Sequence, residues 1–209
     1  MSEPRRLFAV IPAAGHSRRM GQPKLILPLG GTTVIERVLT VLDHPAIVAR
    51  CVVVRASDAP LTEAVRRAGG LVLHPPVDPP DMRVSVSFAL ETIQREFSPR
   101  EDDGWLLVPA DHPVLDRSLI ETLIATWERD HPLILVPRVG DRRGHPTLFR
   151  WSLAREIVRI PVDLGLNWLL SEHAGEVREL PVEGDAALTD LDTPEDYERL
   201  RCQTPRDLM

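Results

Sequence analysis

The chain has few cysteines, few aromatic residues and no long apolar run. Only Cys51 and Cys202 occur among 209 residues, and aromatic residues make up 4%. Two distant cysteines suggest neither a disulfide framework nor a zinc site, and this favours a cytoplasmic protein. No apolar stretch approaches the roughly 20 residues that span a bilayer, and the opening residues do not read as a signal peptide. We therefore expect no membrane partner.

An excess of positive charge is also missing. The chain has 25 Lys and Arg against 31 Asp and Glu, which gives a formal net charge of −6. Surfaces that bind nucleic acid need an excess of cations, so we expect no nucleic-acid partner, although a local anion site stays open. With 43% hydrophobic and 27% charged residues and no break in composition, the sequence predicts a single globular domain over residues 1–209.

Short apolar runs alternate with helical patterns through most of the chain. The runs at 7–12, 50–56, 70–74, 105–110 and 133–139 are typical of buried strands. The segments at 32–43, 59–69, 83–97 and 116–130 carry apolar residues three or four positions apart, as helices do. Further on, the pattern indicates strands at 144–149 and 177–183, helices at 152–158 and 164–173, and a terminal segment at 188–200.

This alternation predicts an α/β fold of the Rossmann-like, doubly wound kind. A mostly parallel sheet would be covered by helices on both faces, in three layers, and ligands would bind beyond the carboxyl ends of the strands. Functional residues are therefore expected just after strands.

The segment VIPAAGHSRRMGQPKL, residues 10–25, places small and cationic residues directly after the first strand. Ala13, Ala14 and Gly15 would let backbone amides approach an anion closely. Arg18, Arg19 and Lys24 add charge, so the loop could hold a polyphosphate. Alternatively, these three side chains are ordinary solvated charges on a surface loop. The patterns G-x-x-x-x-G-K-[ST] and G-x-G-x-x-G are absent, which disfavours a kinase or a dehydrogenase.

The same loop matches the pattern A-A-G-x-S-x-R-M-G-x-x-K at Ala13, Ala14, Gly15, Ser17, Arg19, Met20, Gly21 and Lys24. It resembles the signature loop of the MobA-like nucleotidyltransferases, which include molybdenum cofactor cytidylyl- and guanylyltransferases. The resemblance implies the nucleotide-diphospho-sugar transferase type of fold. It also implies that the loop, with Ser17, Arg18 and Gly21, binds the nucleotide and that Arg19 and Lys24 act in catalysis. Ala-Ala-Gly in place of Leu-Ala-Gly-Gly favours CTP over GTP.

Two aspartates complete the resemblance. VPADHP at 108–113 gives Asp111, and DLDTPEDY at 190–197 gives Asp192. The family likeness implies that both bind Mg²⁺ and that Asp111 takes part in catalysis. Magnesium is commonly held by one or two carboxylates plus substrate phosphates, and carboxylates at strand ends can converge on one crevice. A helix cap for Asp192 and a turn for Asp111 are the structural alternatives.

Three further residues are candidates through the same resemblance. RRGHPTLF at 142–149 implies that His145 borders the acceptor, with His112 on the same side, and DMRVSVSFAL at 81–90 implies that Ser85 contacts the base or ribose. A purely structural histidine in a rigid turn is an equal alternative for His145. A helix cap, or merely a small helical residue, is the alternative for Ser85.

The resemblance implies a Mg²⁺-dependent transfer of a nucleoside monophosphate, first of all CMP, from a nucleoside triphosphate to a phosphorylated small-molecule acceptor. Molybdopterin is one candidate acceptor. Ala110-Asp111-His112-Pro113 matches neither the Gly-Asp-Gln-Pro of the cytidylyl branch nor the Cys-Asp-Met-Pro of the guanylyl branch, and VDLGLNW at 162–168 also departs from it. A sugar- or polyol-phosphate acceptor, and a nucleotide-binding protein without catalysis, are the other readings.

Overall fold

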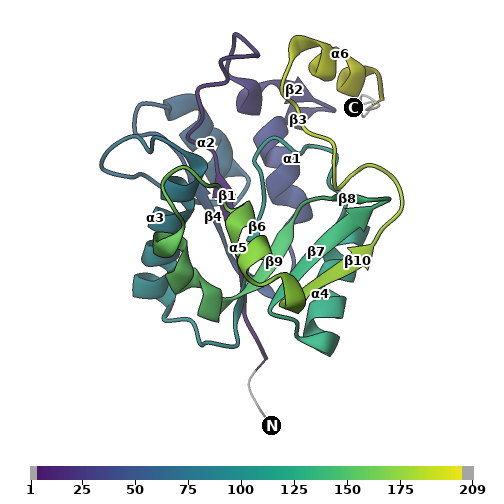
Figure 1. Cartoon of the computed structure of the whole chain (residues 1–209). Coiled ribbons are helices and arrows are strands. Elements are labelled where there is room, and N and C mark those ends of the chain that lie inside the picture. Colours follow the sequence, from purple (N-terminus) through teal and green to yellow (C-terminus); the bar gives the residue numbers. More distant parts are fainter. Residues whose placement is uncertain (1–3, 204–209) are drawn as a thin grey trace.

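An eight-stranded, mostly parallel sheet lies at the centre of the computed structural model, which describes residues 4–203 (Figure 1). Its strands run in the order β10-β7-β9-β6-β1-β4-β5, and β8 pairs with β7. The strands are β1 (Leu7–Pro12), β4 (Ile47–Val53), β5 (Leu71–Leu73), β6 (Gly104–Leu107), β7 (Ile134–Val139), β8 (Arg142–Arg143), β9 (Thr147–Arg150) and β10 (Val177–Pro181). Strand β9 is antiparallel to both of its neighbours, β6 and β7.

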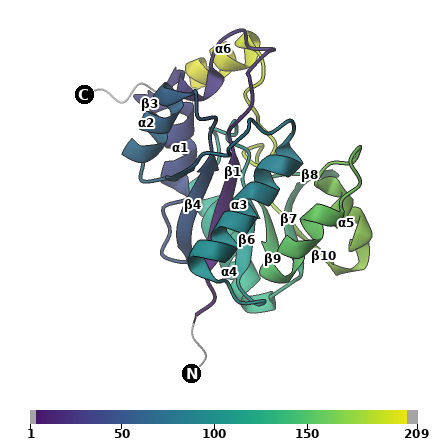
Figure 2. The same ribbon diagram turned by 90° about the vertical axis from the view of Figure 1, so that its left-hand side faces the viewer.

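Helices cover both faces of this sheet, as Figures 1 and 2 show. Helices α1 (Val34–Val41), α2 (Ala59–Arg67) and α4 (Arg117–Asp130) pack on one face. Helices α3 (Met82–Phe97) and α5 (Asn167–Glu172), with the 3₁₀ segment η2 (Trp151–Arg159), pack on the other. Side chains of β1 alternate between the two faces, Leu7 toward the first and Phe8 toward the second. The predicted three-layer, doubly wound fold is confirmed.

The departures from the predicted elements are local. The segment at 152–158 forms a 3₁₀ helix, and the strand expected at 144–149 begins only at Thr147. Strands β2 (Pro28–Leu29), β3 (Thr32–Thr33) and β8 are too short to give a periodic pattern. The same holds for the 3₁₀ turns η1 (Lys24–Ile26) and η3 (Ala174–Glu176). No helix in residues 4–203 is long and apolar enough to cross a membrane.

Helix starts are fixed by acidic or hydroxyl caps at the carboxyl edge of the sheet. Asp58, Asp81 and Asp116 accept hydrogen bonds from the first turns of α2, α3 and α4. Thr33 and Glu36 form a reciprocal capping box at the start of α1. The last helix, α6 (Pro194–Gln203), lies beside β2, where the Tyr197 hydroxyl donates to the Pro28 carbonyl at 2.6 Å (Figure 1).

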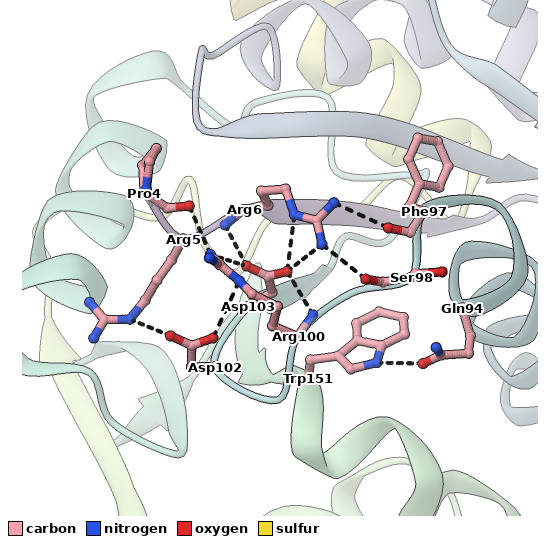
Figure 3. A network of polar contacts seen from close by, with 10 residues as sticks. All are labelled: Pro4, Arg5, Arg6, Gln94, Phe97, Ser98, Arg100, Asp102, Asp103 and Trp151. Carbon is pink, nitrogen blue, oxygen red and sulfur yellow. Dashed lines mark hydrogen bonds and ion pairs between the residues drawn. The ribbon is translucent and has the colours of Figure 1, made fainter. Parts of the chain in front are cut away.

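A buried carboxylate ties the starts of β1 and β6 together at the opposite edge (Figure 3). The Asp103 side chain is fully buried and accepts from Arg6 Nη2 at 2.8 Å and from Arg100 Nη2 at 3.0 Å. The backbone amides of Arg6 and Arg100 donate to it as well, each at 2.9 Å. Because hydrogen-bond donors surround the Asp103 carboxylate, we assign it a structural role. It lies at the end of the strands opposite the carboxyl edge of the sheet.

Candidate active site

Three charged side chains from distant parts of the chain meet at the carboxyl edge of the sheet. Lys24 Nζ lies 2.5 Å from Asp111 Oδ2 and 2.8 Å from Asp192 Oδ1. Arg19 Nη2 lies 2.8 Å from the other oxygen of Asp192. Asp111 and Asp192 therefore converge, although only Asp111 comes shortly after a strand, β6, and Asp192 lies in the segment between β10 and α6.

The backbone explains this convergence. The Val108 amide donates to the Val10 carbonyl at 3.0 Å, which carries the β1–β6 pairing toward Asp111. The Leu191 amide then donates to the Asp111 carbonyl at 2.9 Å, so the two segments that bear the acids are joined directly.

Asp196 holds the second segment in place. Its Oδ2 accepts from the backbone amides of Asp192 and Thr193 at 3.2 and 3.0 Å and from the Thr193 hydroxyl at 2.9 Å. Burial opposes ionisation of Asp196, but hydrogen bonds from Arg199, Thr193 and the Asp192 backbone outweigh it and lower its pKa to about 2. The Asp192 side chain itself binds Lys24 and Arg19, so a helix cap is not its role here.

The protonated form of Lys24 is favoured in this position. Burial alone would lower the pKa of Lys24, but the Asp111 and Asp192 carboxylates outweigh burial and raise it. Its side chain is 14% exposed, and those of Asp111 and Asp192 are 25% and 20% exposed. Lys24 is also the only lysine in the chain, whose other basic residues are all arginine. Its compact ammonium donates to both carboxylates from a single nitrogen.

The two acids also fit a hard divalent cation. An oxygen of each lies within 2.8 Å of Lys24 Nζ, and both side chains are partly open to water. Two neighbouring carboxylates are a donor set that Mg²⁺ or Mn²⁺ accepts when phosphates and waters complete its shell. Among residues 4–203 no group of three or more His, Cys, Asp or Glu side chains forms a metal site.

The loop after β1 folds around Ser17. Ser17 takes a left-handed backbone (φ 49°), its hydroxyl accepts from the Lys24 amide at 3.3 Å, and its carbonyl accepts from Met20 and Gly21, each at 3.1 Å. Gly21 has φ 69°, which a residue with a side chain adopts only with strain. The Ala13 amide donates to the Val53 carbonyl at 2.9 Å, so the amides that remain for an anion begin at Ala14.

Most of the predicted residues line one cavity of about 440 Å³. The loop supplies one wall, the start of α3 a second and the two acids a third. The predicted residues in its lining are Ala13, Ala14, Gly15, Ser17, Arg18, Arg19, Lys24, Ser85, Asp111 and Asp192. Gly21 lines a neighbouring cavity instead.

Ser85 lies in the first turn of α3, with its hydroxyl donating to the Asp81 carbonyl at 3.2 Å. Asp81 caps this helix, because its side chain accepts from the Val84 amide at 2.9 Å. The cap alternative for Ser85 is therefore wrong. Ser85 is buried and still lines the cavity, which leaves contact with a ligand as a prediction.

His112 and His145 do not line either of these two cavities. Their rings meet edge to face with centroids 5.4 Å apart, and Nδ1 of each is buried without a hydrogen-bond partner among the described residues. Burial lowers the pKa of both rings, that of His145 to about 4 with help from His112. The turn at Gly144 and His145 is tightly built, since the His145 amide donates to the Ala187 carbonyl at 2.8 Å. Their acceptor role stays a prediction.

Two residues of the site escape the sequence patterns. Asp196 belongs to the D-T-P-E-D run, where its distance of four residues from Asp192 is the available signal. Arg55 follows β4 and gives no motif at all, yet it lies in the wall of the neighbouring cavity. Its placement after a strand is the only pointer to it.

A doubly wound sheet with a cationic loop and paired acids at its carboxyl edge is an arrangement found in α/β proteins that bind nucleotides. A family model described as the MobA-like NTP transferase domain matches residues 9–177. The chain belongs to this family.

Curated relatives are cytidylyltransferases. The chain is 33% identical over 135 residues to the 2-C-methyl-D-erythritol 4-phosphate cytidylyltransferase of Tolumonas auensis, a match that covers 62% of this chain and 56% of the relative. The same enzyme from Pseudomonas entomophila is 37% identical over 127 residues, covering 59% and 53%. The chain thus matches little more than half the length of these relatives.

Solved structures match over nearly the whole chain. Rv0371c from Mycobacterium tuberculosis is 28% identical with a TM-score of 0.77, covering 94% of this chain and 98% of that one. A structure of the same protein in complex with manganese has a TM-score of 0.72 at 28% identity, with the same coverage of both chains. A 4-diphosphocytidyl-2C-methyl-D-erythritol synthase, 20% identical, has a TM-score of 0.74 over 96% of this chain and 99% of its own, which shows the fold.

Proposed function

We propose that this chain is a cytidylyltransferase that moves CMP from CTP to a phosphorylated small-molecule acceptor and releases pyrophosphate. The observation that carries the proposal is the contact of Lys24 with both Asp111 and Asp192 in the wall of the cavity that also holds the loop and Ser85. A triphosphate needs cations, amides and a metal-binding pair of acids in one place, and these residues supply them.

The loop and Ser85 bind the nucleotide in this proposal. Arg18 and Arg19, which are exposed at the cavity, and the amides from Ala14 onward meet the phosphates, and Ser85 meets the base or ribose. Ser17 and Gly21 shape the loop through their left-handed backbones. Curated relatives that use cytidine nucleotides support CTP as the donor.

Asp111 and Asp192 would hold the magnesium ion, whose bound charge would polarise the α-phosphate. An acceptor phosphate oxygen attacks the α-phosphorus, a new P–O–P link forms, and the bond to the β-phosphate breaks. Arg19 and Lys24 stabilise the charge that collects on the leaving pyrophosphate. The acceptor is already an anion, so no strong general base is needed.

A polyol phosphate is the first acceptor to test, because the curated relatives are named for 2-C-methyl-D-erythritol 4-phosphate. A phosphorylated pterin such as molybdopterin is the second, because the resemblance of the loop after β1 implies it. The buried pair of His112 and His145 beside Asp111 would border this acceptor.

Release of pyrophosphate tests the proposal. The purified chain is incubated with Mg²⁺, with CTP, GTP, UTP or ATP, and with either acceptor. We expect release with CTP, and Asp111→Asn should remove it while Asp190→Asn, which changes an exposed acid in the same region, should not. Binding of CTP in a thermal-shift assay without release for any acceptor would instead indicate a nucleotide-binding protein without catalysis.

A further inference from the structure

The two proposed metal-binding acids lie in segments without regular structure. Asp111 belongs to the segment at 108–116, between β6 and α4, and Asp192 to the segment at 182–193, between β10 and α6. Neither segment contains a strand or a helix that would fix the direction of its acid. A metal ion that takes an oxygen from each acid needs both carboxylates in a constant geometry. Contacts with other parts of the chain must therefore help to hold these segments.

Residues 24–41 form a compact unit next to both segments. The unit begins with Lys24 in η1 and continues through β2 and β3 into α1. The Leu27 amide donates to the Lys24 carbonyl at 3.3 Å, and the Val34 amide donates to the Leu27 carbonyl at 3.1 Å. Helix α1 is fixed in turn by its buried face and by its capping box. The backbone that carries Lys24 is therefore joined to a firmly packed helix.

Arg37 connects this unit to the segment of Asp111. Its Nε donates to the Pro113 carbonyl at 3.2 Å, and Pro113 follows Asp111 by two residues. Pro113 is buried, and a buried carbonyl needs a hydrogen-bond donor. Arg37, which is half-buried on α1, supplies this donor and holds the turn after Asp111.

Tyr197 connects the same unit to the segment of Asp192. Its hydroxyl donates to the Pro28 carbonyl of β2 at 2.6 Å, and α6 lies next to β2 and β3 in both views (Figures 1 and 2). The Tyr197 amide donates to the Thr193 carbonyl at 3.1 Å, so Tyr197 lies in the first turn after Asp192. Its ring also packs against the hydrophobic core. Tyr197 therefore anchors the start of α6, and with it the segment that bears Asp192.

We infer that Tyr197 and Arg37 are positioning residues, which hold the segments of Asp192 and Asp111 on residues 24–41 and so keep both acids in place for a divalent cation. The inference rests on the proposed function, which gives the two acids their metal. Neither Tyr197 nor Arg37 lines the nucleotide cavity, so both act through the backbone that they hold. The unit that carries Lys24 thus also places the two acids that Lys24 contacts.

Binding of Mn²⁺ alone to the full chain, measured by electron paramagnetic resonance of free Mn²⁺, tests this inference. Tyr197→Phe removes only the hydroxyl that reaches Pro28, and Arg37→Met removes only the guanidinium. Each should weaken Mn²⁺ binding about threefold to tenfold, the effect of losing one ordinary hydrogen bond.

Two control variants lose comparable hydrogen bonds elsewhere. Thr92→Val deletes a hydroxyl that donates to the Phe88 carbonyl within α3 at 2.9 Å. Arg50→Met deletes a guanidinium that donates to the Leu39 carbonyl at 3.0 Å. Neither bond leads to an acid-bearing segment, so both controls should keep the native affinity for Mn²⁺.

The dependence of turnover on metal concentration separates positioning from a general loss of stability. Tyr197→Phe and Arg37→Met should need several-fold more Mg²⁺ for half-maximal turnover and approach the native rate when Mg²⁺ is saturating. A merely structural role would instead lower turnover equally at every Mg²⁺ concentration.

Three results would overturn the inference: native Mn²⁺ affinity in Tyr197→Phe and Arg37→Met, equal losses in Thr92→Val and Arg50→Met, or no binding of Mn²⁺ to the native chain. If Arg37→Met melts early, Tyr197→Phe carries the test, because it removes a single oxygen atom. Weaker Mn²⁺ binding in the two variants, with no CMP transfer by the native chain to any acceptor, would refute the proposed function and keep the positioning role. CMP transfer with native Mn²⁺ affinity in both variants would do the reverse.

Discussion

Lys24 places its ammonium 2.5 Å from a carboxylate oxygen of Asp111, across 87 positions of sequence. The same nitrogen contacts Asp192, so the only lysine of the chain lies between the two acids that are proposed to hold a metal. A lysine in this position compensates two like charges that would otherwise repel. It also competes with any divalent cation for the same oxygens.

Lys24→Met separates these two effects. Loss of a fixed charge at the leaving group should lower turnover by on the order of 100-fold. Without nucleotide, however, the variant should bind Mn²⁺ on the order of tenfold more tightly, because the competing ammonium is gone. Electron paramagnetic resonance of free Mn²⁺ measures the second effect, and Arg18→Met, which removes an exposed cation from the same loop, is the control. Unchanged Mn²⁺ affinity would contradict the competition.

Asp196 is expected to act as a positioning residue. It fixes the backbone of Asp192 and Thr193 and does not line the cavity. Asp196→Ala should lower turnover about tenfold and weaken Mn²⁺ binding in parallel, because a less well positioned Asp192 would impair both catalysis and metal binding. Asp196→Asn, which keeps one acceptor oxygen, should recover part of each. Glu195→Ala changes the adjacent exposed acid and should leave metal binding as it is; an equal loss there would assign the effect to helix α6 as a whole.

The fold could be predicted because its strongest signals are local. Buried runs such as 7–12 and 105–110 leave little choice but central strands, and helical spacing between them implies parallel pairing. Strand β9 could not be placed the same way. Its antiparallel course between β6 and β7 depends on where the chain returns, and an apolar run does not record its direction.

The site was predictable only in part. Its position after β6 places Asp111 at the carboxyl edge of the sheet, as a strand-end residue is expected to lie. Asp192 comes well after β10, so its contact with Lys24 could not be derived from a strand end. The sequence did not reveal that the Ala13 amide donates to the Val53 carbonyl. A sequence pattern does not show which backbone amides are hydrogen-bonded within the sheet and which are free. The sequence did not reveal Arg55 either, because the segment that begins with it, RASDAP, is typical of an ordinary turn.

Gly144→Ala should disturb the second acid from a distance. A Cβ at Gly144 would lie 2.4 Å from the Ala187 carbonyl oxygen, and Ala187 begins the approach to Asp192. Relieving this clash must move the backbone, so we expect a loss of about 1–3 kcal/mol in the free energy of unfolding and several-fold lower turnover. Denaturant unfolding and steady-state rates measure the two. Gly175→Ala, where a Cβ meets nothing within 4 Å, is the control, and native behaviour of Gly144→Ala would refute the clash.

Asp103→Asn should reduce stability without touching the proposed chemistry. Burial alone would raise the pKa of Asp103, but hydrogen bonds from Arg6 and Arg100 outweigh burial and lower it from 3.8. We expect a cost of about 3 kcal/mol at neutral pH, the low end for a broken buried ion pair, because both guanidiniums reach solvent.

The pH dependence gives the sign of this effect. A depressed carboxyl pKa stabilises the folded chain fully above the unfolded value of 3.8, and this stabilisation disappears as the pH falls below it. The difference in melting temperature between the native chain and Asp103→Asn should therefore be large at pH 7 and shrink below about pH 4. Calorimetric scans across this range measure it, with pyrophosphate affinity at pH 7 as the check that the site is intact. A difference that stays constant down to pH 3 would show that the charge on Asp103 contributes nothing.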